Sequence, residues 1–116
     1  MKDDIKQTSL AHHSLRVWHY AVELTRLVGK HRIENATLRD QAIRAVTSVG
    51  LNISEGAGRD GKTRTNHFRI ARGSASEVVA AYELAVALGE PHDIAAITQT
   101  AARVSAMLFG LIKRPL

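Results

Sequence analysis

The chain has 116 residues, of which 45% are hydrophobic and 23% are charged, and it contains no cysteine. These values fit one globular domain; they exclude a disordered protein, a disulfide scaffold, a zinc ribbon and a thiol nucleophile. The formal net charge of +5 favours a polyanionic partner. No apolar run approaches the roughly 18 residues of a membrane span, and the N-terminus lacks an apolar signal core. We therefore expect a cytoplasmic protein with no membrane contact.

Apolar residues recur at three- and four-residue spacing in four segments, which is typical of helices with one buried face. The first predicted helix covers about residues 14–29, with Ser14 as its N-cap. Its apolar stripe consists of Val17, Ala21, Leu24 and Val28. The second helix is predicted to begin after Thr37, whose hydroxyl is suited to cap it, and to end near Gly56.

The third predicted helix is the longest and covers about residues 65–88, with Gly89 as its C-terminal cap and Pro91 as the stop. The fourth covers about residues 92–112. The tight turn between these two long helices makes them antiparallel. The prediction is therefore an all-α fold without a sheet, an antiparallel up-down four-helix bundle.

The predicted bundle domain covers residues 14–116 and follows an N-terminal tail, residues 1–13. Its third and fourth helices each carry a second apolar stripe. On the third helix the stripe consists of Ile70, Ser74, Ala81, Leu84 and Leu88. On the fourth helix it consists of Thr98, Ala102, Ser105, Phe109 and Ile112. A monomeric bundle needs one broad stripe per helix, so the surplus favours a homo-oligomer, with a wide core face as the alternative.

Positive charge is concentrated in one window that holds five basic residues and one acidic residue. The basic residues are Arg59, Lys62, Arg64, Arg69 and Arg72. The first three are predicted on or beside a glycine-rich loop, and the last two on the first turns of the third helix. Such a cluster suits RNA phosphates, with little base readout because the aromatic residues lie mostly at core spacing. Alternatively, these cations pair with Glu55, Asp60 and Glu77.

Residues 56–63 match the phosphate-loop pattern G-x-x-x-x-G-K-[ST], in which Lys62 would meet phosphates and Thr63 would hold magnesium. Residues 49–54 also alternate like a strand. However, no apolar run ending in Asp follows, and the chain offers no second strand for a parallel sheet. Helical spacing explains the same residues, so we expect no nucleotide hydrolysis.

Other chemistry is equally weakly indicated. The six histidines lack the converging spacing of a metal site, and no G-x-S-x-G element is present. Glu55 and Glu77 are the candidates for a carboxylate pair, but each is better explained as a partner of an arginine. Gly73 lies inside the longest helix, which suggests close approach of another backbone or a kink. We expect no catalytic residue, no metal and no cofactor.

Three segments together resemble one protein family. Residues 48–59 read S-V-G-L-N-I-S-E-G-A-G-R and resemble the family pattern S-I-P-A-N-I-A-E-G-x-G-R. Residues 68–77 resemble F-L-x-I-A-x-G-S-x-x-E, and residues 15–24 resemble L-x-V-W-x-x-A-x-E-L. The family comprises the four-helix bundle proteins encoded in intervening sequences of bacterial 23S ribosomal RNA genes. The chain departs from the pattern at Gly50, where the family has Pro, and at Ser54, where it has Ala.

The resemblance implies a ring-shaped homopentamer with a basic surface and no enzyme activity. A more distant likeness, to the accessory variability protein of diversity-generating retroelements, implies binding to nucleic acid and to a reverse transcriptase. The signature residues of the resemblance are Trp18, Asn52, Glu55, Gly56, Gly58, Gly73, Ser74 and Glu77. The favoured interpretation is an oligomeric protein that binds structured RNA. The alternative is an adaptor that docks a reverse transcriptase or an RNA-processing enzyme.

Overall fold

The structure, a computed structural model, describes residues 9–114. The part of the predicted tail that covers residues 1–8 lies outside this range. A short 3-10 helix, η1 (Ala11–Ser14), precedes four α-helices. These are α2 (Arg16–Lys30), α3 (Ala36–Ala57), α4 (Gly61–Ala87) and α5 (Ala95–Lys113). No strand occurs in the described residues, so the predicted all-α fold with four helices is confirmed for this part of the chain.

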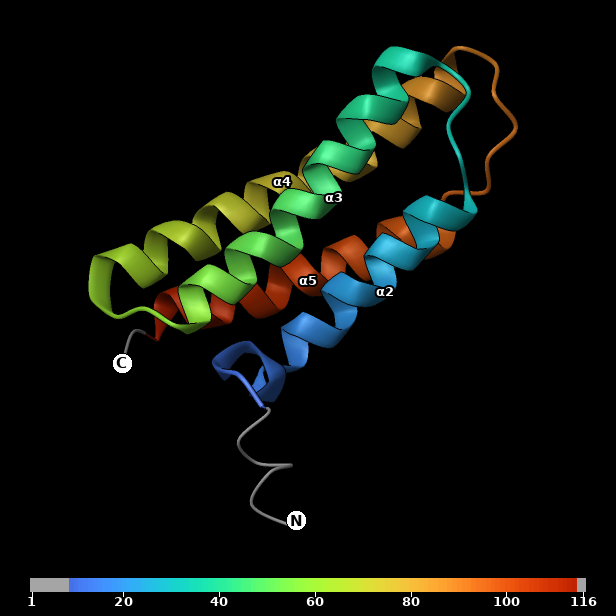
Figure 1. Cartoon of the computed structure of the whole chain (residues 1–116). Coiled ribbons are helices and arrows are strands. Elements are labelled where there is room, and N and C mark those ends of the chain that lie inside the picture. The colour runs from blue at the N-terminus through green and yellow to red at the C-terminus, as the bar shows by residue number, and fades with distance from the viewer. Residues whose placement is uncertain (1–8, 115–116) are drawn as a thin grey trace, which may run out of the picture.

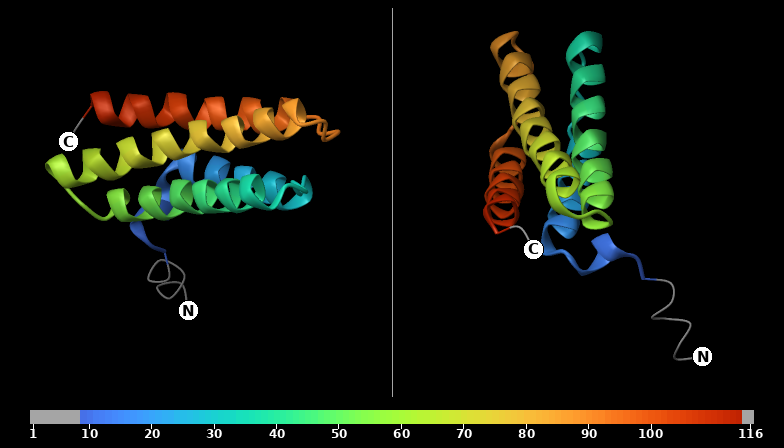
Figure 2. Two further views of the ribbon diagram at one scale, coloured as in Figure 1. Left: turned by 90° about the horizontal axis from the view of Figure 1, so that it is seen from above. Right: turned by 90° about the vertical axis from the view of Figure 1, so that its left-hand side faces the viewer.

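The four long helices lie side by side, with α3 and α4 as one layer over α2 and α5 (Figures 1 and 2). Within the layers, α3 packs against α4 and α2 packs against α5. Between the layers, α2 packs against α3 and α4 packs against α5. The predicted stripe of α2 is buried in this arrangement. The largest side chains of the core are Tyr82, Phe68, Leu24, Ile33, Ile53, Ile97 and Leu108. They come from all four helices and from the α2–α3 connection.

Several helix ends differ from the predictions. Ser14 does not cap α2, because it ends η1 and its hydroxyl donates to the Ala11 carbonyl. Asn35, rather than Thr37, caps α3: its Oδ1 accepts from the Leu38 N–H at 3.0 Å. α4 begins at Gly61 instead of about residue 65.

The connection between α4 and α5 keeps the predicted stop, because Gly89 has a left-handed backbone with φ of +100°. Glu90 then ties this connection to the one between α2 and α3. Its carboxylate accepts from the Glu34 N–H at 2.8 Å and from the Asn35 N–H at 2.9 Å, and it lies 2.7 Å from Nε2 of His92. The hydrogen bond from Glu34, followed by that from His92, lowers the pKa of Glu90. Both connections lie at the same end of the molecule (Figure 1).

A close crossing of α3 and α4 occurs at Gly56, which is buried. A Cβ atom at this position would lie 2.6 Å from Cε1 of Phe68. Gly73, where the sequence suggested such an approach, is exposed, and a Cβ there would have no atom within 4 Å. The glycine that the packing requires is therefore Gly56, and the interpretation of Gly73 as a close approach within the chain is wrong.

The helix α5 is long and apolar enough to cross a membrane by length and composition, with a mean hydropathy of 1.3. The expectation from the sequence that no apolar run approaches the length of a membrane span is therefore wrong for α5. In the structure, α5 packs against α2 and α4 and buries Ile97, Ala101, Val104 and Leu108. One such helix is weak support for a membrane span, since core helices also meet the same criterion.

Candidate nucleic-acid interface

The five predicted cations do not form one cluster. Arg59 follows α3 and its Nη2 lies 3.3 Å from Oε2 of Glu55, as the pairing alternative predicted. Arg64 lies in the first turn of α4, where its Nη1 donates to the Gly56 carbonyl at 3.4 Å. The guanidinium of Arg64 also lies 4.8 Å from the centroid of the Phe68 ring. Arg64 therefore links the start of α4 to the end of α3, whereas the Arg59–Glu55 pair stays within the end of α3 and the residue that follows it.

Lys62 lies on α4 rather than on a loop, and its side chain is exposed. Arg69 and Arg72 lie further along α4, also exposed, and line a groove between α4 and α5. Nε of Arg72 donates to the Ser105 hydroxyl at 3.0 Å, and its guanidinium lies 4.8 Å from the centroid of the Phe109 ring. An arginine held by a hydroxyl and an aromatic face loses less side-chain freedom when it binds a ligand.

The opposite wall of this groove comes from α5, which the sequence interpretation did not include in the site. Nζ of Lys113 lies 5.2 Å from the centroid of the same Phe109 ring. The groove has a volume of about 640 Å³. Its lining consists of Arg69, Arg72, Gly73, Ser76, Ser105, Phe109, Ile112 and Lys113. The lining thus combines three cations, two hydroxyls and one aromatic ring with no carboxylate.

The other side of α5 also carries positive charge. A second groove, between the start of α2 and the end of α5, includes Arg16, Lys113 and Arg114 in its lining. Nη1 of Arg103 lies 3.4 Å from the Tyr20 hydroxyl, and this hydrogen bond and the charge of Arg103 lower the pKa of Tyr20. From residue 95 to residue 114 the sequence has three basic residues and no acidic residue. This local charge imbalance is the signal from which the contribution of α5 could have been predicted.

Most signature residues lie between helices rather than on this surface. Asn52 accepts from Nδ1 of His67 at 2.8 Å and donates from Nδ2 to the Ser48 hydroxyl at 3.1 Å. The Ser74 hydroxyl donates to that of Ser48 at 2.9 Å, which completes a polar seam between α3 and α4. Trp18 packs against the His12 ring, with 4.4 Å between ring centroids.

The remaining signature residues have separate positions. Gly58 is the C-cap residue that follows α3, while Glu55, Gly73 and Glu77 are exposed. Of these exposed residues, Glu55 forms the ion pair with Arg59, and Gly73 lines the α4–α5 groove.

The phosphate-loop match spans the end of α3, the short connection of residues 58–60 and the start of α4. Residues 49–54 lie within α3, as helical spacing predicted, and Gly56 and Ala57 form its last turn. Lys62 and Thr63 lie in the first turn of α4. A phosphate loop follows a strand and precedes a helix, whereas here the helix α3 precedes the match and the described residues contain no strand. Within residues 9–114, no three His, Asp or Glu side chains converge as metal ligands.

Comparison with known families decides the family of the chain. A family model described as the 23S rRNA-intervening sequence protein matches residues 13–110. The chain belongs to this family. The family match covers η1 in part, α2, α3 and α4 in full and most of α5, and it confirms the likeness of the three segments. Comparison with curated proteins and with solved structures gives no match.

Proposed function

We propose that this member of the 23S rRNA-intervening sequence protein family is a non-enzymatic, oligomeric protein that binds structured RNA. The proposal assigns binding to the groove between α4 and α5. The observation that supports it most strongly is the acid-free lining, in which Arg69, Arg72 and Lys113 converge. Cations without carboxylate partners attract polyanions without first having to break ion pairs. The family description, which refers to ribosomal RNA, is consistent with an RNA ligand.

The two walls of the groove have complementary roles in this proposal. Arg69 is an exposed charge that follows the phosphate backbone. Arg72 is held by Ser105 and Phe109, and Lys113 lies over the same Phe109 ring. Gly73 has open space where a side chain would lie, which lets a phosphate approach the backbone of α4 closely. Of the cations predicted from the sequence, Arg69 and Arg72 remain in the proposed site, and exposed Lys62 extends it along α4.

We further propose that the antiparallel up-down bundle assembles into a ring-shaped homopentamer. Four exposed apolar side chains support assembly; the subunit number rests on the family resemblance. These side chains are Leu51, Ile70, Leu84 and Leu88, with exposed fractions of 43% to 68%. A ring would repeat the groove around an axis, so that weak individual contacts add. Light scattering coupled to size exclusion tests this proposal; a mass near 12.7 kDa at micromolar concentration would contradict it.

The RNA proposal is tested by fluorescence anisotropy with a labelled RNA hairpin. The groove variant combines Arg69→Gln, Arg72→Gln and Lys113→Gln. The matched control combines Arg26→Gln, Lys30→Gln and Arg44→Gln, which removes the same charge from exposed positions on α2 and α3. We expect the groove variant to bind about tenfold or more weakly at low salt and the control to change by much less.

Circular dichroism and light scattering verify that both variants keep the fold and the assembly of the wild type. Equal losses in the two variants would mean that net charge alone attracts the RNA and that the groove is not the site. If the folded wild type fails to bind any hairpin, the RNA proposal is wrong and the adaptor interpretation takes its place.

A further inference from the structure

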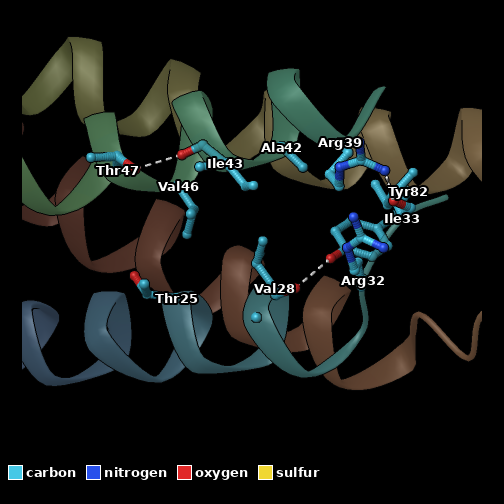
Figure 3. A pocket seen from close by; sticks show the side chains of 11 residues that line it. Thr25, Val28, Arg32, Ile33, Arg39, Ala42, Ile43, Val46, Thr47 and Tyr82 are labelled. Atoms are coloured by element: carbon cyan, nitrogen blue, oxygen red, sulfur yellow. Dashed lines mark hydrogen bonds between the residues drawn. The ribbon is translucent and has the colours of Figure 1, made fainter. Parts of the chain in front are cut away.

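A separate hollow lies between α2 and α3, with Tyr82 of α4 also in its lining (Figure 3). It has a volume of about 370 Å³ and does not share a lining residue with the α4–α5 groove. Apolar side chains line its middle, with Val28 on one side and Ala42, Ile43 and Val46 on the other (Figure 3). Pockets of this size and apolar character commonly bind small molecules.

The hydroxyl groups of the lining are already committed. Thr25 and Thr47 each donate to the backbone carbonyl four residues earlier, at 2.8 Å and 2.6 Å. The Tyr82 hydroxyl donates to the His31 carbonyl oxygen at 2.7 Å, and it also lies 3.1 Å from the Val28 carbonyl oxygen. The donor hydrogens of these hydroxyls are therefore already used, and together with the hydrocarbon side chains this lining favours a ligand with an apolar body.

Two arginines supply the polar groups that remain. Figure 3 shows Arg32 and Arg39 at one end of the hollow beside Ile33, while Thr47 lies toward the other end. Nη1 of Arg39 donates to the carbonyls of Ile33 and Glu34 at 3.2 Å and 3.0 Å. Carbonyl partners fix the guanidinium without neutralising its charge. Neither arginine forms an ion pair with a carboxylate among the described residues.

We propose that this hollow binds an amphipathic anion, a hydrocarbon chain that ends in a carboxylate. The carboxylate lies against Arg32 and Arg39, since planar guanidinium groups match carboxylate oxygens in geometry and charge. The chain extends toward Thr47. Arg39 and Thr47 are separated by two turns of α3, about 12 Å of helix rise, which suits a medium-length aliphatic chain. The inference is independent of RNA binding, because the two sites use different residues.

Isothermal titration calorimetry with decanoate, below its micelle concentration, tests the proposal. Decan-1-ol has the same chain without the charge, and we expect it to bind about tenfold more weakly. Arg32→Gln weakens decanoate binding about tenfold but leaves decan-1-ol binding unchanged. Thr47→Phe, at an exposed lining position, fills the apolar end and abolishes binding of both. Arg44→Gln removes an exposed charge from α3 outside the hollow and leaves both affinities unchanged.

Equal affinity for decanoate and decan-1-ol would overturn the assignment of an anion. Unchanged binding in the folded Thr47→Phe variant would show that the ligand lies elsewhere, and no binding by the wild type would refute the proposal outright. Light scattering during the titration tests whether a second copy of the chain, rather than a small ligand, occupies the hollow. If decanoate splits an assembly into monomers, a second copy of the chain normally covers the hollow and the ligand proposal is wrong.

Discussion

A methyl group added at Gly56 tests how closely α3 and α4 cross. In Gly56→Ala the new Cβ would lie 2.6 Å and 2.8 Å from two ring carbons of Phe68, and 3.2 Å from Cβ of His67. Phe68 is fully buried, and the guanidinium of Arg64 lies against its ring. A buried ring in a close-packed core can move little, so the helices must separate or the core must repack.

The magnitude follows from two opposing effects. Overpacking in a close-packed core costs about 1 to 3 kcal/mol. Replacing glycine by alanine inside a helix returns about 1 kcal/mol through helix propensity. Because two of the new contacts would be shorter than 3 Å, the upper part of this overpacking range, about 2 to 3 kcal/mol, applies. Gly56→Ala should therefore lower the free energy of unfolding by about 1 to 2 kcal/mol. Gly73→Ala is the matched control, because its Cβ has no atom within 4 Å. It should raise the free energy of unfolding by about 0.5 to 1 kcal/mol.

Urea unfolding, followed by circular dichroism at one fixed protein concentration, measures both variants. Fixed concentration matters because assembly couples stability to concentration. We expect Gly73→Ala to be the most stable of the three proteins, the wild type to be intermediate and Gly56→Ala to be the least stable. If Gly56→Ala is as stable as the wild type, the crossing is looser than the structure indicates. If both variants lose the same free energy, the steric argument for Gly56 fails.

Three further predictions concern Tyr82, Glu90 and Lys62. Tyr82→Phe should cost about 1 kcal/mol, because it removes a buried hydrogen-bond donor. Burial raises the pKa of Tyr82 to about 12, so stability that depends on its neutral hydroxyl is present below about pH 10 and is lost as the pH rises through 12. Urea titrations across this range should show a larger loss in the wild type than in Tyr82→Phe, and equal losses would contradict this role of Tyr82. Glu90→Gln should lower the melting temperature near neutral pH. Because the pKa of Glu90 is lowered in the fold, its advantage over Gln should fade as the pH falls below about 4.5. An unchanged difference would contradict a stabilising role for the hydrogen bonds from Glu34 and Asn35 to the Glu90 carboxylate. Purified protein should not hydrolyse ATP or GTP, and Lys62→Ala should leave that assay unchanged; turnover abolished by this substitution would restore the phosphate-loop interpretation.

The helices and their buried faces could be predicted because apolar spacing is a local property of the sequence. Their ends were less predictable. Asn35 and Thr37 are two residues apart, and both residue types suit an N-cap. Only the structure shows that Oδ1 of Asn35 accepts the hydrogen bond from the Leu38 N–H. Gly56 and Gly73 both stand out in a helical sequence. Only the crossing of α3 and α4 distinguishes the glycine that Phe68 covers from the one that faces open space.

The candidate site was predictable only where it depends on local sequence, and not where it depends on contacts between helices. Arg69 and Arg72 follow from charge concentration and helical spacing. Lys113 and Phe109 are more than 30 residues away, and they join the site through the packing of α5 on α4. Phe109 fits an apolar stripe by spacing, but the structure leaves 45% of it exposed and places Arg72 against its ring. The expectation that aromatic residues are mostly withdrawn into the core therefore does not hold for this ring.

The salt dependence of RNA binding tests the role of the α4–α5 groove most directly. Each phosphate that a cation neutralises contributes about 0.7 to 0.9 to the slope of log affinity against log salt. The variant that combines Arg69→Gln, Arg72→Gln and Lys113→Gln should therefore have a slope shallower than the wild type by about 2 to 3. The matched variant on α2 and α3 should keep the wild-type slope. A groove variant that retains the full slope would show that phosphates do not contact these three residues and would contradict the proposed interface.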